Sequence, residues 1–350
     1  MSQPLRFPAE WEPQSAVLLA WPHAGTDWAA RLGEVEETFI ALVAAITRFE
    51  PAVVCVADDD IEAYARARLA SARVDMVRVR FVVLPYNDTW LRDTGPITLV
   101  PAGGGKGTPV LLDFRFTGWG GKFEAGEDDQ LVERLSRMGI FSNSVAEPID
   151  FALEGGAIET DGAGTLLSTW RCLGERHPDS DPETVGKQLA AWLRQDRVLW
   201  LRHGYLEGDD TDAHVDTLAR FAAPDAIVFQ ACDDPDDSHY GELRAMADEI
   251  AALRTRDGRP YRLFPLPWPR PIRDADGDRR LAASYANFLI VNGAVLVPAY
   301  GDPADDPAAA VLAEAFPGRE IVQVPCRALI WQNGSLHCLT MQLPAGIMAG

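Results

Sequence analysis

The sequence predicts a mixed α/β fold, because short apolar runs of strand length alternate with longer helical candidates along its 350 residues. A second observation, the recurrence of polar residues at strand entrances, predicts several similar units. The expected strands cover residues 15–21, 52–57, 79–85, 96–101, 109–114, 165–169, 197–201, 226–231, 287–291, 294–299, 320–325 and 336–342. The expected helices cover residues 28–48, 60–72, 127–138, 182–195, 239–254 and 306–316.

Along the sequence, a pair of expected strands often precedes an expected helix. The Gly-rich segment 101–109 spans only a hairpin-sized gap between strands 96–101 and 109–114. A helical candidate such as 127–138 or 182–195 then separates the pair from the next strand. Two strands, a helix and a third strand make a β-β-α-β unit.

Polar residues at strand entrances recur about every sixty residues, a spacing long enough for one β-β-α-β unit. Each precedes or opens a strand that is usually followed by a turn and a second strand. These positions are Asp93, Glu154, His214 with Asp216, Asn287 and Cys338. The recurrence suggests five units around a centre, where the polar positions meet if the strand starts converge.

Length and composition indicate a soluble protein. A chain of this length buries roughly three quarters of the surface that its unfolded form exposes, so it needs neither disulfides nor a metal to fold. No low-complexity linker divides it, and we expect a single domain over residues 1–350. The amino-terminal stretch lacks the pattern of a signal peptide, and no run of about 18 apolar residues occurs. We therefore expect a cytoplasmic location.

The net charge and the cysteine pattern limit the kinds of binding partner and cysteine site that we expect. The net charge of −20 at pH 7 repels nucleic acid and anionic membranes and would attract a small cation. The cysteine number is odd and no C-x-x-C pair occurs, which argues against a disulfide framework or a zinc site. The five cysteines are Cys55, Cys172, Cys232, Cys326 and Cys338. The sequence leaves the oligomeric state open, and a homo-oligomer is one option.

Cys338 is the strongest candidate for a nucleophile. It follows a Gly334-Ser335 turn that can leave the head of its expected strand accessible, whereas the other four cysteines fit apolar strands or a loop-like segment and are interpreted as structural. His337 should face away from Cys338 on a strand, so the base must come from elsewhere. His214 is the best candidate, because in an extended segment Asp216 shares its face.

Structural alternatives exist for each polar candidate. Asp93, before a Thr-Gly-Pro turn, could cap backbone amides, and Glu154 stands in a short E-G-G motif whose glycines permit close backbone approach. The acidic run that includes Asp209, Asp210 and Asp212 could bind a metal together with His214 and Asp216. No second histidine follows at a ligand spacing, so we expect a solvated loop and no metal.

The remaining constellation is a thiol, an imidazole and three carboxylates. No phosphate loop, G-x-G-x-x-G or G-x-S-x-G motif accompanies it, so no cofactor is expected. Three acids exceed what a cysteine protease needs to orient its histidine. They suit a flat cation with many donors, because a guanidinium carries five N–H groups that carboxylates can clamp.

Seven motifs carry a resemblance to a known family. They are "PAEWEPQSAVLLAWPH" (8–23), "TWLRDTGP" (89–96), "DFRFTGWGGK" (113–122), "EGGAIETDGAGTLLST" (154–169), "GDDTDAHVDTLARF" (208–221), "YANFLIVNGAVLVPAYGD" (285–302) and "GSLHCLTMQLP" (334–344). In this order the chain resembles the agmatine deiminase family of the guanidine-modifying superfamily, which includes arginine and peptidylarginine deiminases. The resemblance implies a single catalytic domain, a five-bladed α/β propeller of β-β-α-β units around a central active site.

The resemblance also implies roles for the polar residues. Cys338 would be the nucleophile and His214 the general acid and base, while Asp93 and Asp216 would clamp the guanidinium. Glu154 would orient His214 and contact the substrate. The implied reaction is the hydrolysis of agmatine to N-carbamoylputrescine and ammonia through a thiouronium on the cysteine, a step toward putrescine. Candidates for further substrate contacts are Asn87, Asp88, Trp90, Trp119 and Asp210.

Two departures from the family pattern bear on the substrate. Residues 334–338 read G-S-L-H-C where some members have G-G-x-H-C, and "RCLGERHPDS" (171–180) lacks the C-L-L-N…R-N-P run of other agmatine deiminases. Deimination of arginine or peptidylarginine, amidino transfer on the same core, and a non-catalytic polyamine-binding protein therefore remain alternatives.

Overall fold

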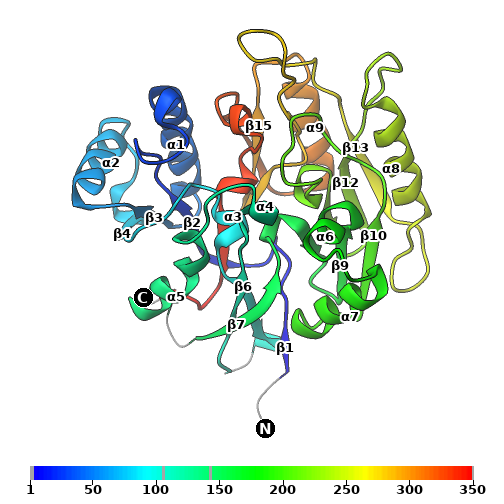
Figure 1. The fold of residues 1–350 in the computed structure, drawn as a ribbon, viewed down its shortest axis with the longest axis horizontal. Coiled ribbons are helices and arrows are strands. Elements are labelled where there is room, and N and C mark those ends of the chain that lie inside the picture. Colours follow the sequence, from blue (N-terminus) through cyan, green and yellow to red (C-terminus); the bar gives the residue numbers. More distant parts are fainter. Residues whose placement is uncertain (1–3, 105–106, 142–143, 349–350) are drawn as a thin grey trace.

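The computed structural model describes residues 4–104, 107–141 and 144–348, and within them the strands form five small sheets (Figure 1). Neighbouring strands within each sheet are joined by hyphens in the following list. The five sheets are β17(Met341–Pro344)-β2(Gln14–Ala20)-β3(Ala52–Val56)-β4(Val79–Val83), β1(Leu5–Arg6)-β5(Ile97–Pro101)-β6(Val110–Arg115)-β7(Val145–Ala152), β8(Ile158–Thr160)-β9(Thr165–Thr169)-β10(Arg197–Leu201), β11(Ala219–Ala223)-β12(Ala226–Gln230)-β13(Arg262–Leu266) and β14(Leu289–Val291)-β15(Ala294–Ala299)-β16(Glu320–Pro325). The expectation of a mixed α/β fold is confirmed.

Four of the sheets share one plan. Their first two long strands pair antiparallel, as in β8/β9 and β11/β12, and the next pair is parallel, as in β9/β10 and β12/β13. Parallel neighbours need a crossover, and a helix supplies it in each case. The crossover helices are α5(Leu131–Arg137), α7(Pro182–Trp192), α8(Tyr240–Ala252) and α9(Asp305–Ala315).

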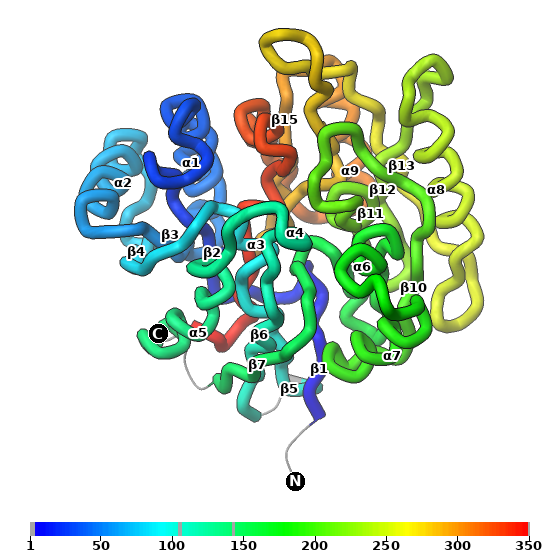
Figure 2. The backbone as a smooth tube through the Cα atoms, in the orientation of Figure 1, coloured from blue at the N-terminus to red at the C-terminus, as the bar shows by residue number. Residues whose placement is uncertain are grey.

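The remaining sheet joins the two ends of the described chain. Strand β17 pairs antiparallel with β2, and helices α1(Leu32–Thr47) and α2(Asp59–Ser71) connect the parallel strands β2, β3 and β4. In Figure 2 the red C-terminal tube accordingly passes beside the blue N-terminal tube. The long helices α1, α2 and α8 lie toward the outer edge of Figure 1, whereas the short α3(Leu91–Thr94) and α4(Gly118–Gly121) lie near its middle.

Strands missed by the sequence reasoning lack a continuous apolar run. Strand β7 carries Glu147, Pro148 and Asp150 and is exposed at several positions, and β13 is likewise only partly buried. Strand β11 contains Arg220, whose charge interrupts the pattern. Two residues of the expected Gly-rich turn, 105–106, lie outside the described part of the chain, but β5 and β6 on either side of it pair antiparallel.

Helix starts follow local hydrogen-bonding rules. Asp58 accepts a hydrogen bond from the Ile61 amide at 2.8 Å at the start of α2, and Asp181 accepts one from the Thr184 amide at 2.7 Å at the start of α7. Pro182 then occupies the first turn of α7, where its missing N–H costs nothing.

The largest buried apolar cluster extends from the outer helices to the middle of the molecule. Phe39 of α1 packs against Trp21 with ring centroids 6.1 Å apart. The same cluster includes Trp90, Trp119 and Cys338, so the packing that holds the helices also fixes these central residues.

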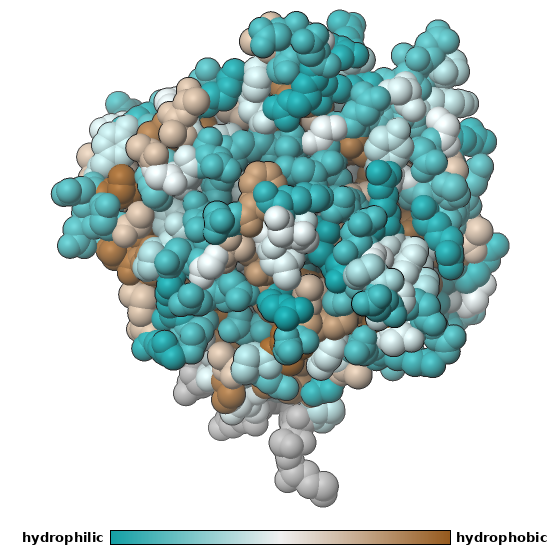
Figure 3. All heavy atoms as spheres, viewed as in Figure 1, coloured by the Kyte–Doolittle hydropathy of each residue, from teal (hydrophilic) through white to brown (hydrophobic). Residues whose placement is uncertain are grey.

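The face drawn in Figure 3 is mostly hydrophilic, with apolar residues scattered in small groups. Among the described residues, helices long and apolar enough to span a bilayer are absent.

Replacing Phe39 with alanine should lower the free energy of unfolding by about 3–5 kcal/mol, because a fully buried ring is lost and leaves a cavity. The urea midpoint of the variant measures this loss. Val77→Ala is the control: Val77 is 95% exposed, and its loss should change stability by less than about 0.5 kcal/mol. Equal midpoints for the two variants would contradict the packing described here.

Candidate active site

A cavity of about 600 Å³ opens near the middle of the molecule. Asp93 and Cys338 line it, and so do all five residues expected to make further substrate contacts: Asn87, Asp88, Trp90, Trp119 and Asp210. The remaining lining residues are Gly25, Asp27, Gly121, Lys122, Phe123, Glu124, Asp128, Thr211, Trp331, Gln332, Asn333 and Gly334. A cavity of this size and polarity can hold a small ligand.

The polar positions that recur in the sequence lie at equivalent places in the five sheets. Each precedes, by a few residues, a strand that forms the antiparallel pair of its sheet: Asp93 precedes β5, Glu154 precedes β8, His214 and Asp216 precede β11, Asn287 precedes β14, and Cys338 precedes β17. All six side chains are buried.

Cys338 lies in a short 3₁₀ helix, His337–Leu339, and not at the head of a strand as expected. Strand β17 begins only at Met341, because the Asn287 side chain holds the preceding turn. The Asn287 Oδ1 accepts hydrogen bonds from the amides of His337 at 2.9 Å and Cys338 at 3.3 Å. Its Nδ2 lies 3.2 Å from the Cys338 Sγ, so the amide group positions the thiol directly.

The strand on which His337 and Cys338 were expected to alternate is replaced by a 3₁₀ turn. The two side chains line different cavities, yet both reach one carboxylate. The Nδ1 of His337 lies 2.7 Å from Asp216 Oδ2, and the Cys338 Sγ lies 3.7 Å from the same oxygen.

His214 and Asp216 do not lie in an extended segment either, since Val215–Thr217 forms a 3₁₀ turn. The preceding Asp212 and Ala213 adopt positive φ angles of 67° and 70°, which redirect the chain into the site. The two nitrogens of His214 face two carboxylates: Nδ1 is 3.7 Å from Asp93 Oδ1 and Nε2 is 3.6 Å from Glu154 Oε2.

Asp93 does not cap its own Thr-Gly-Pro turn. Its Oδ1 accepts a hydrogen bond from the amide of Gly156 at 2.9 Å, and its Oδ2 accepts one from Trp119 Nε1 at 2.9 Å. These bonds join three segments that are distant in sequence and leave the carboxylate facing the cavity.

Gly156 occupies the point where the site residues converge. A Cβ at this position would lie 2.6 Å from His214 Nδ1, 2.8 Å from Asp93 Oδ1 and 3.2 Å from Asp216 Oδ2. Real Cβ atoms do not approach other atoms so closely, so the second glycine of the E-G-G motif is a steric requirement of the site.

Glu154 has two neighbours that the sequence reasoning did not place in the site. Arg176 donates from Nε to Glu154 Oε1 at 2.7 Å, and the Cys172 Sγ lies 3.9 Å from Glu154 Oε2. Both belong to helix α6(Trp170–Arg176), where a loop-like segment was expected. Their i, i+4 spacing, which puts them on one helix face, was the available signal.

Charges around the site set the protonation states. Burial opposes the charged form of His214, but Asp93 and other neighbours outweigh it and raise the pKa of His214 well above its usual value. Burial, followed by the charges of Asp216 and Asp93, raises the pKa of Cys338. Against burial, His214 and Arg176 lower the pKa of Glu154. The ligand-free site therefore holds an imidazolium and a neutral thiol.

Three buried polar atoms of the site lack a hydrogen-bond partner: His214 Nδ1, His214 Nε2 and Asp216 Oδ1. Buried polar groups in native proteins are almost always satisfied. The two His214 nitrogens each face a carboxylate, so Asp216 Oδ1 is the acceptor of this group that is left for a polar ligand.

The acidic run weighed as a metal site is engaged in protein contacts. Asp210 accepts from Asn333 at 2.8 Å, and Asp212 accepts from Lys122 and Arg176, each at 2.7 Å. Within the described residues, one group has its potential ligand atoms close enough to hold a metal: Glu154, Cys172 and His214. The Arg176 guanidinium bonded to Glu154 opposes a further cation there.

A buried thiol that contacts Asp216, with an imidazole held between Asp93 and Glu154 and a cavity that Cys338 and Asp93 line, defines a candidate for cysteine-dependent catalysis. Comparison with known proteins assigns the family. The Porphyromonas-type peptidyl-arginine deiminase family matches residues 6–344, so the chain belongs to it.

Three related proteins cover nearly the whole chain. The agmatine deiminase of Stutzerimonas stutzeri (strain A1501) is 35% identical over 366 residues, which cover 97% of this chain and 95% of the relative. The structure of a candidate arginine deiminase from Porphyromonas gingivalis is 45% identical with a TM-score of 0.90, covering 99% and 100% of the two chains. A substrate-bound agmatine deiminase variant from C. jejuni is 31% identical with a TM-score of 0.88, covering 97% and 96%.

Alkylation of Cys338 by iodoacetamide should be slow at neutral pH in the ligand-free protein. Because the pKa of this thiol is raised, the rate should keep increasing above pH 8.5, where an ordinary thiol is half ionised. Mass spectrometry of the labelled peptide measures the rate, and Cys338→Ala corrects for other cysteines. A rate that reaches its plateau below pH 8 would contradict the described electrostatics.

Proposed function

We propose that the protein hydrolyses agmatine to N-carbamoylputrescine and ammonia. The observation that carries the proposal is a buried thiol and imidazolium among three carboxylates, with unpartnered polar atoms, at the end of an acidic cavity. The names of the relatives support it, since agmatine deiminases match nearly the full chain in sequence and in structure.

We further infer that the five sheets are the blades of an α/β propeller and that residues 1–350 act as one catalytic domain. The shared order of an antiparallel and a parallel strand pair supports this arrangement. So does the position of each polar site residue at an equivalent strand entrance.

Binding would begin with the guanidinium between Asp93 and Asp216. Asp93 has a raised pKa of about 6, caused by burial and then by the neighbouring charges of Asp216 and Glu154, against the favourable His214. A cation between the two carboxylates relieves this repulsion and keeps both ionised. The unpartnered Oδ1 of Asp216 is the acceptor for one guanidinium N–H.

The same cation activates the nucleophile. Asp93 and Asp216 disfavour the Cys338 thiolate in the empty site, and a guanidinium that neutralises them makes loss of the thiol proton to solvent easier. The thiolate then attacks the central carbon, and His214 protonates one amino group, which leaves as ammonia. The carbon remains bonded to Cys338 as a thiouronium.

Water completes the reaction. Neutral His214 takes a proton from water, and the hydroxide adds to the thiouronium carbon. The C–S bond breaks to regenerate the Cys338 thiolate, and the protonated ureido product gives its extra proton to solvent. Glu154, held by Arg176, orients His214 for both transfers.

The far end of the cavity favours an amine over an amino acid. Its described lining includes the acidic residues Asp27, Asp88, Glu124, Asp128 and Asp210. Lys122 is the one cation among these lining residues, and its Nζ is already bonded to Asp212 and to the Asp210 carbonyl. Burial, with smaller contributions from Asp27 and Asp128, raises the pKa of Asp88 to about 7, and an ammonium bound beside it would favour the ionised carboxylate.

Arginine deimination is the second candidate, because the candidate arginine deiminase from P. gingivalis is 45% identical to this chain. The α-carboxylate of free arginine would enter the acidic end of the cavity. It would meet repulsion there unless Lys122 left its present partners.

Ammonia release from agmatine, free arginine and an arginyl peptide decides between these substrates. We expect agmatine to give the highest kcat/KM, with no loss of rate in EDTA. Cys338→Ala should abolish turnover while still binding agmatine, because the carboxylates that bind the guanidinium remain. Preference for arginine would reject agmatine as the substrate, and turnover by Cys338→Ala at the wild-type rate would reject the nucleophile.

Asp216→Asn should lower kcat/KM for agmatine at least about 30-fold, since losing one partner of a buried charge pair costs about 2–5 kcal/mol. Steady-state kinetics measure the change. Asp225→Asn is the matched control, because Asp225 pairs with Arg262 on the surface. An unchanged kcat/KM in Asp216→Asn would remove this residue from the substrate site.

A further inference from the structure

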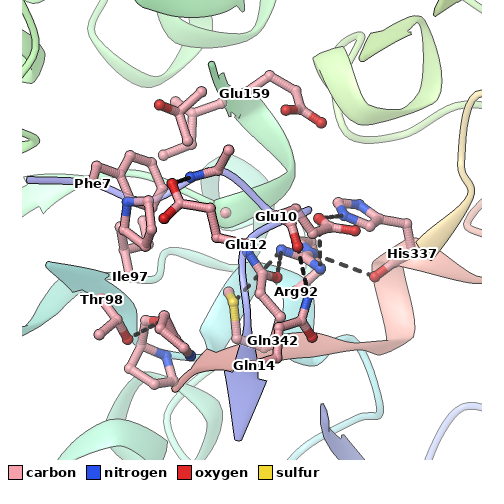
Figure 4. A pocket seen from close by; sticks show the side chains of 18 of the residues that line it. Phe7, Glu10, Glu12, Gln14, Arg92, Ile97, Thr98, Glu159, His337 and Gln342 are labelled. Atoms are coloured by element: carbon pink, nitrogen blue, oxygen red, sulfur yellow. Dashed lines mark hydrogen bonds and ion pairs between the residues drawn. The ribbon is translucent and has the colours of Figure 1, made fainter. Parts of the chain in front are cut away.

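A second, smaller cavity of about 40 Å³ reaches the residues behind Asp216. Glu10, Arg92, His337 and Gln342 line it, and Figure 4 shows the Glu10 carboxylate between the side chains of Arg92 and His337. His337 thus belongs to this cavity and also contacts Asp216, a carboxylate that lies next to Cys338 of the larger cavity.

A continuous chain of buried polar groups runs through His337. Its Nδ1 lies 2.7 Å from Asp216 Oδ2, and its Nε2 lies 2.8 Å from Glu10 Oε2. Arg220 donates to the same Glu10 oxygen at 2.8 Å, and Arg92 Nη2 lies 3.7 Å from it. All five side chains are less than a tenth exposed, so solvent screens these contacts weakly.

The hydrogens available to these buried groups show which group donates and which accepts in each contact. Glu10 accepts from Arg220 on one oxygen and from the Ile290 amide, at 2.7 Å, on the other, so it is an acceptor. Arg220, His337 and Arg92 together lower the pKa of Glu10 against the effect of burial, which keeps it ionised. The Nε2 of His337 must therefore carry a hydrogen.

The contact with Asp216 requires one more proton. Two bare acceptors 2.7 Å apart would repel each other, so one proton lies between Nδ1 and Oδ2, although burial and the charges of Arg220 and Arg92 lower the pKa of His337. This bond occupies Oδ2 and fixes the rotation of the carboxylate. The other oxygen, Oδ1, is buried without a hydrogen-bond partner.

We propose that His337 is a positioning residue: held by Glu10, it bonds Oδ2 of Asp216 and so presents Oδ1 to the guanidinium of the substrate. The inference rests on the proposed function, because it assigns Asp216 to guanidinium binding. The two nitrogens of His337 have different roles in this proposal. The bond from Nδ1 orients the Asp216 carboxylate, and the bond from Nε2 to Glu10 only holds the ring.

Two amide substitutions separate these bonds. In His337→Asn the amide nitrogen can take the place of Nδ1 and keep the bond to Asp216, whereas in His337→Gln it can take the place of Nε2 and keep the bond to Glu10. His337→Gln should lower kcat/KM for agmatine about 10- to 100-fold, mainly through a higher KM, because a hydrogen bond to a charged group is lost. His337→Asn should recover most of this loss.

Agmatine binding, measured by calorimetry in the Cys338→Ala background, should follow the same order. His203→Gln serves as the control, because His203 is an exposed histidine that also faces a carboxylate, that of Glu242. If His337→Gln does not fold, His337→Ala removes the same bond to Asp216 and carries the same expectation. Thermal unfolding of each variant shows that it is folded before its kinetics are compared.

Each outcome decides the inference. Similar kinetics for His337→Asn and His337→Gln, whether both near wild type or both impaired, would overturn it, as would greater impairment in His337→Asn. Failure of the wild-type protein to release ammonia from agmatine would instead reject the proposed function, so the two failures are distinct.

Discussion

Repulsion among buried carboxylates is the constraint on which the rest of the structure depends. Asp93, Glu154 and Asp216 come from the entrances of three different sheets; Asp93 and Asp216 approach Gly156, and Glu154 lies two residues before it. Ionised carboxylates gathered away from water destabilise one another unless positive charge lies between them. His214 lies between Asp93 and Glu154, so the imidazolium is part of the structural solution as well as part of the chemistry.

Ion pairs that neutralise buried charge continue outward from the centre of the candidate site. Arg176 pairs with Glu154 on one side, and on the other Arg220 pairs with Glu10, which holds His337. Arg220 also pairs with Glu159. Positive and negative groups therefore alternate over several layers, each largely buried, while Asp93 also lines the larger cavity. The folding of the protein and the proposed binding of a cation thus depend on the same electrostatic balance.

The sequence predicts the parts of the fold that carry a strong local signal. Long apolar runs such as 15–21 and 294–299 correspond to observed strands, whereas outer strands such as β7 and β13, half exposed and interrupted by proline, lack that signal. The recurrence of polar residues about every sixty positions anticipated five equivalent strand entrances. Local conformation was harder to predict. A 3₁₀ turn at 215–217 lies where an extended segment was expected, and another at 337–339 lies at the head of an expected strand.

Some features of the candidate site could likewise be predicted from the sequence, and others could not. The local sequence pointed to Cys338 and His214, and the resemblance to a family implied roles for them, but contacts among residues far apart in sequence had no pattern to reveal them. Glu10 and Arg220, for example, are separated by 210 positions and meet only because the segment between β1 and β2 lies against β11. Such ion pairs depend on the assembled tertiary structure, and a single sequence carries no record of the pairing.

The pairing of β17 with β2 also orders events during synthesis. The strand that follows Cys338 pairs with a strand that is synthesised much earlier, so that sheet stays incomplete until translation has passed the thiol. A nascent chain can already contain every carboxylate and the imidazole while it still lacks the sulfur. Chains terminated before Cys338 would therefore lack the proposed nucleophile, and the unpaired edge of β2 would expose them to chaperones or proteases.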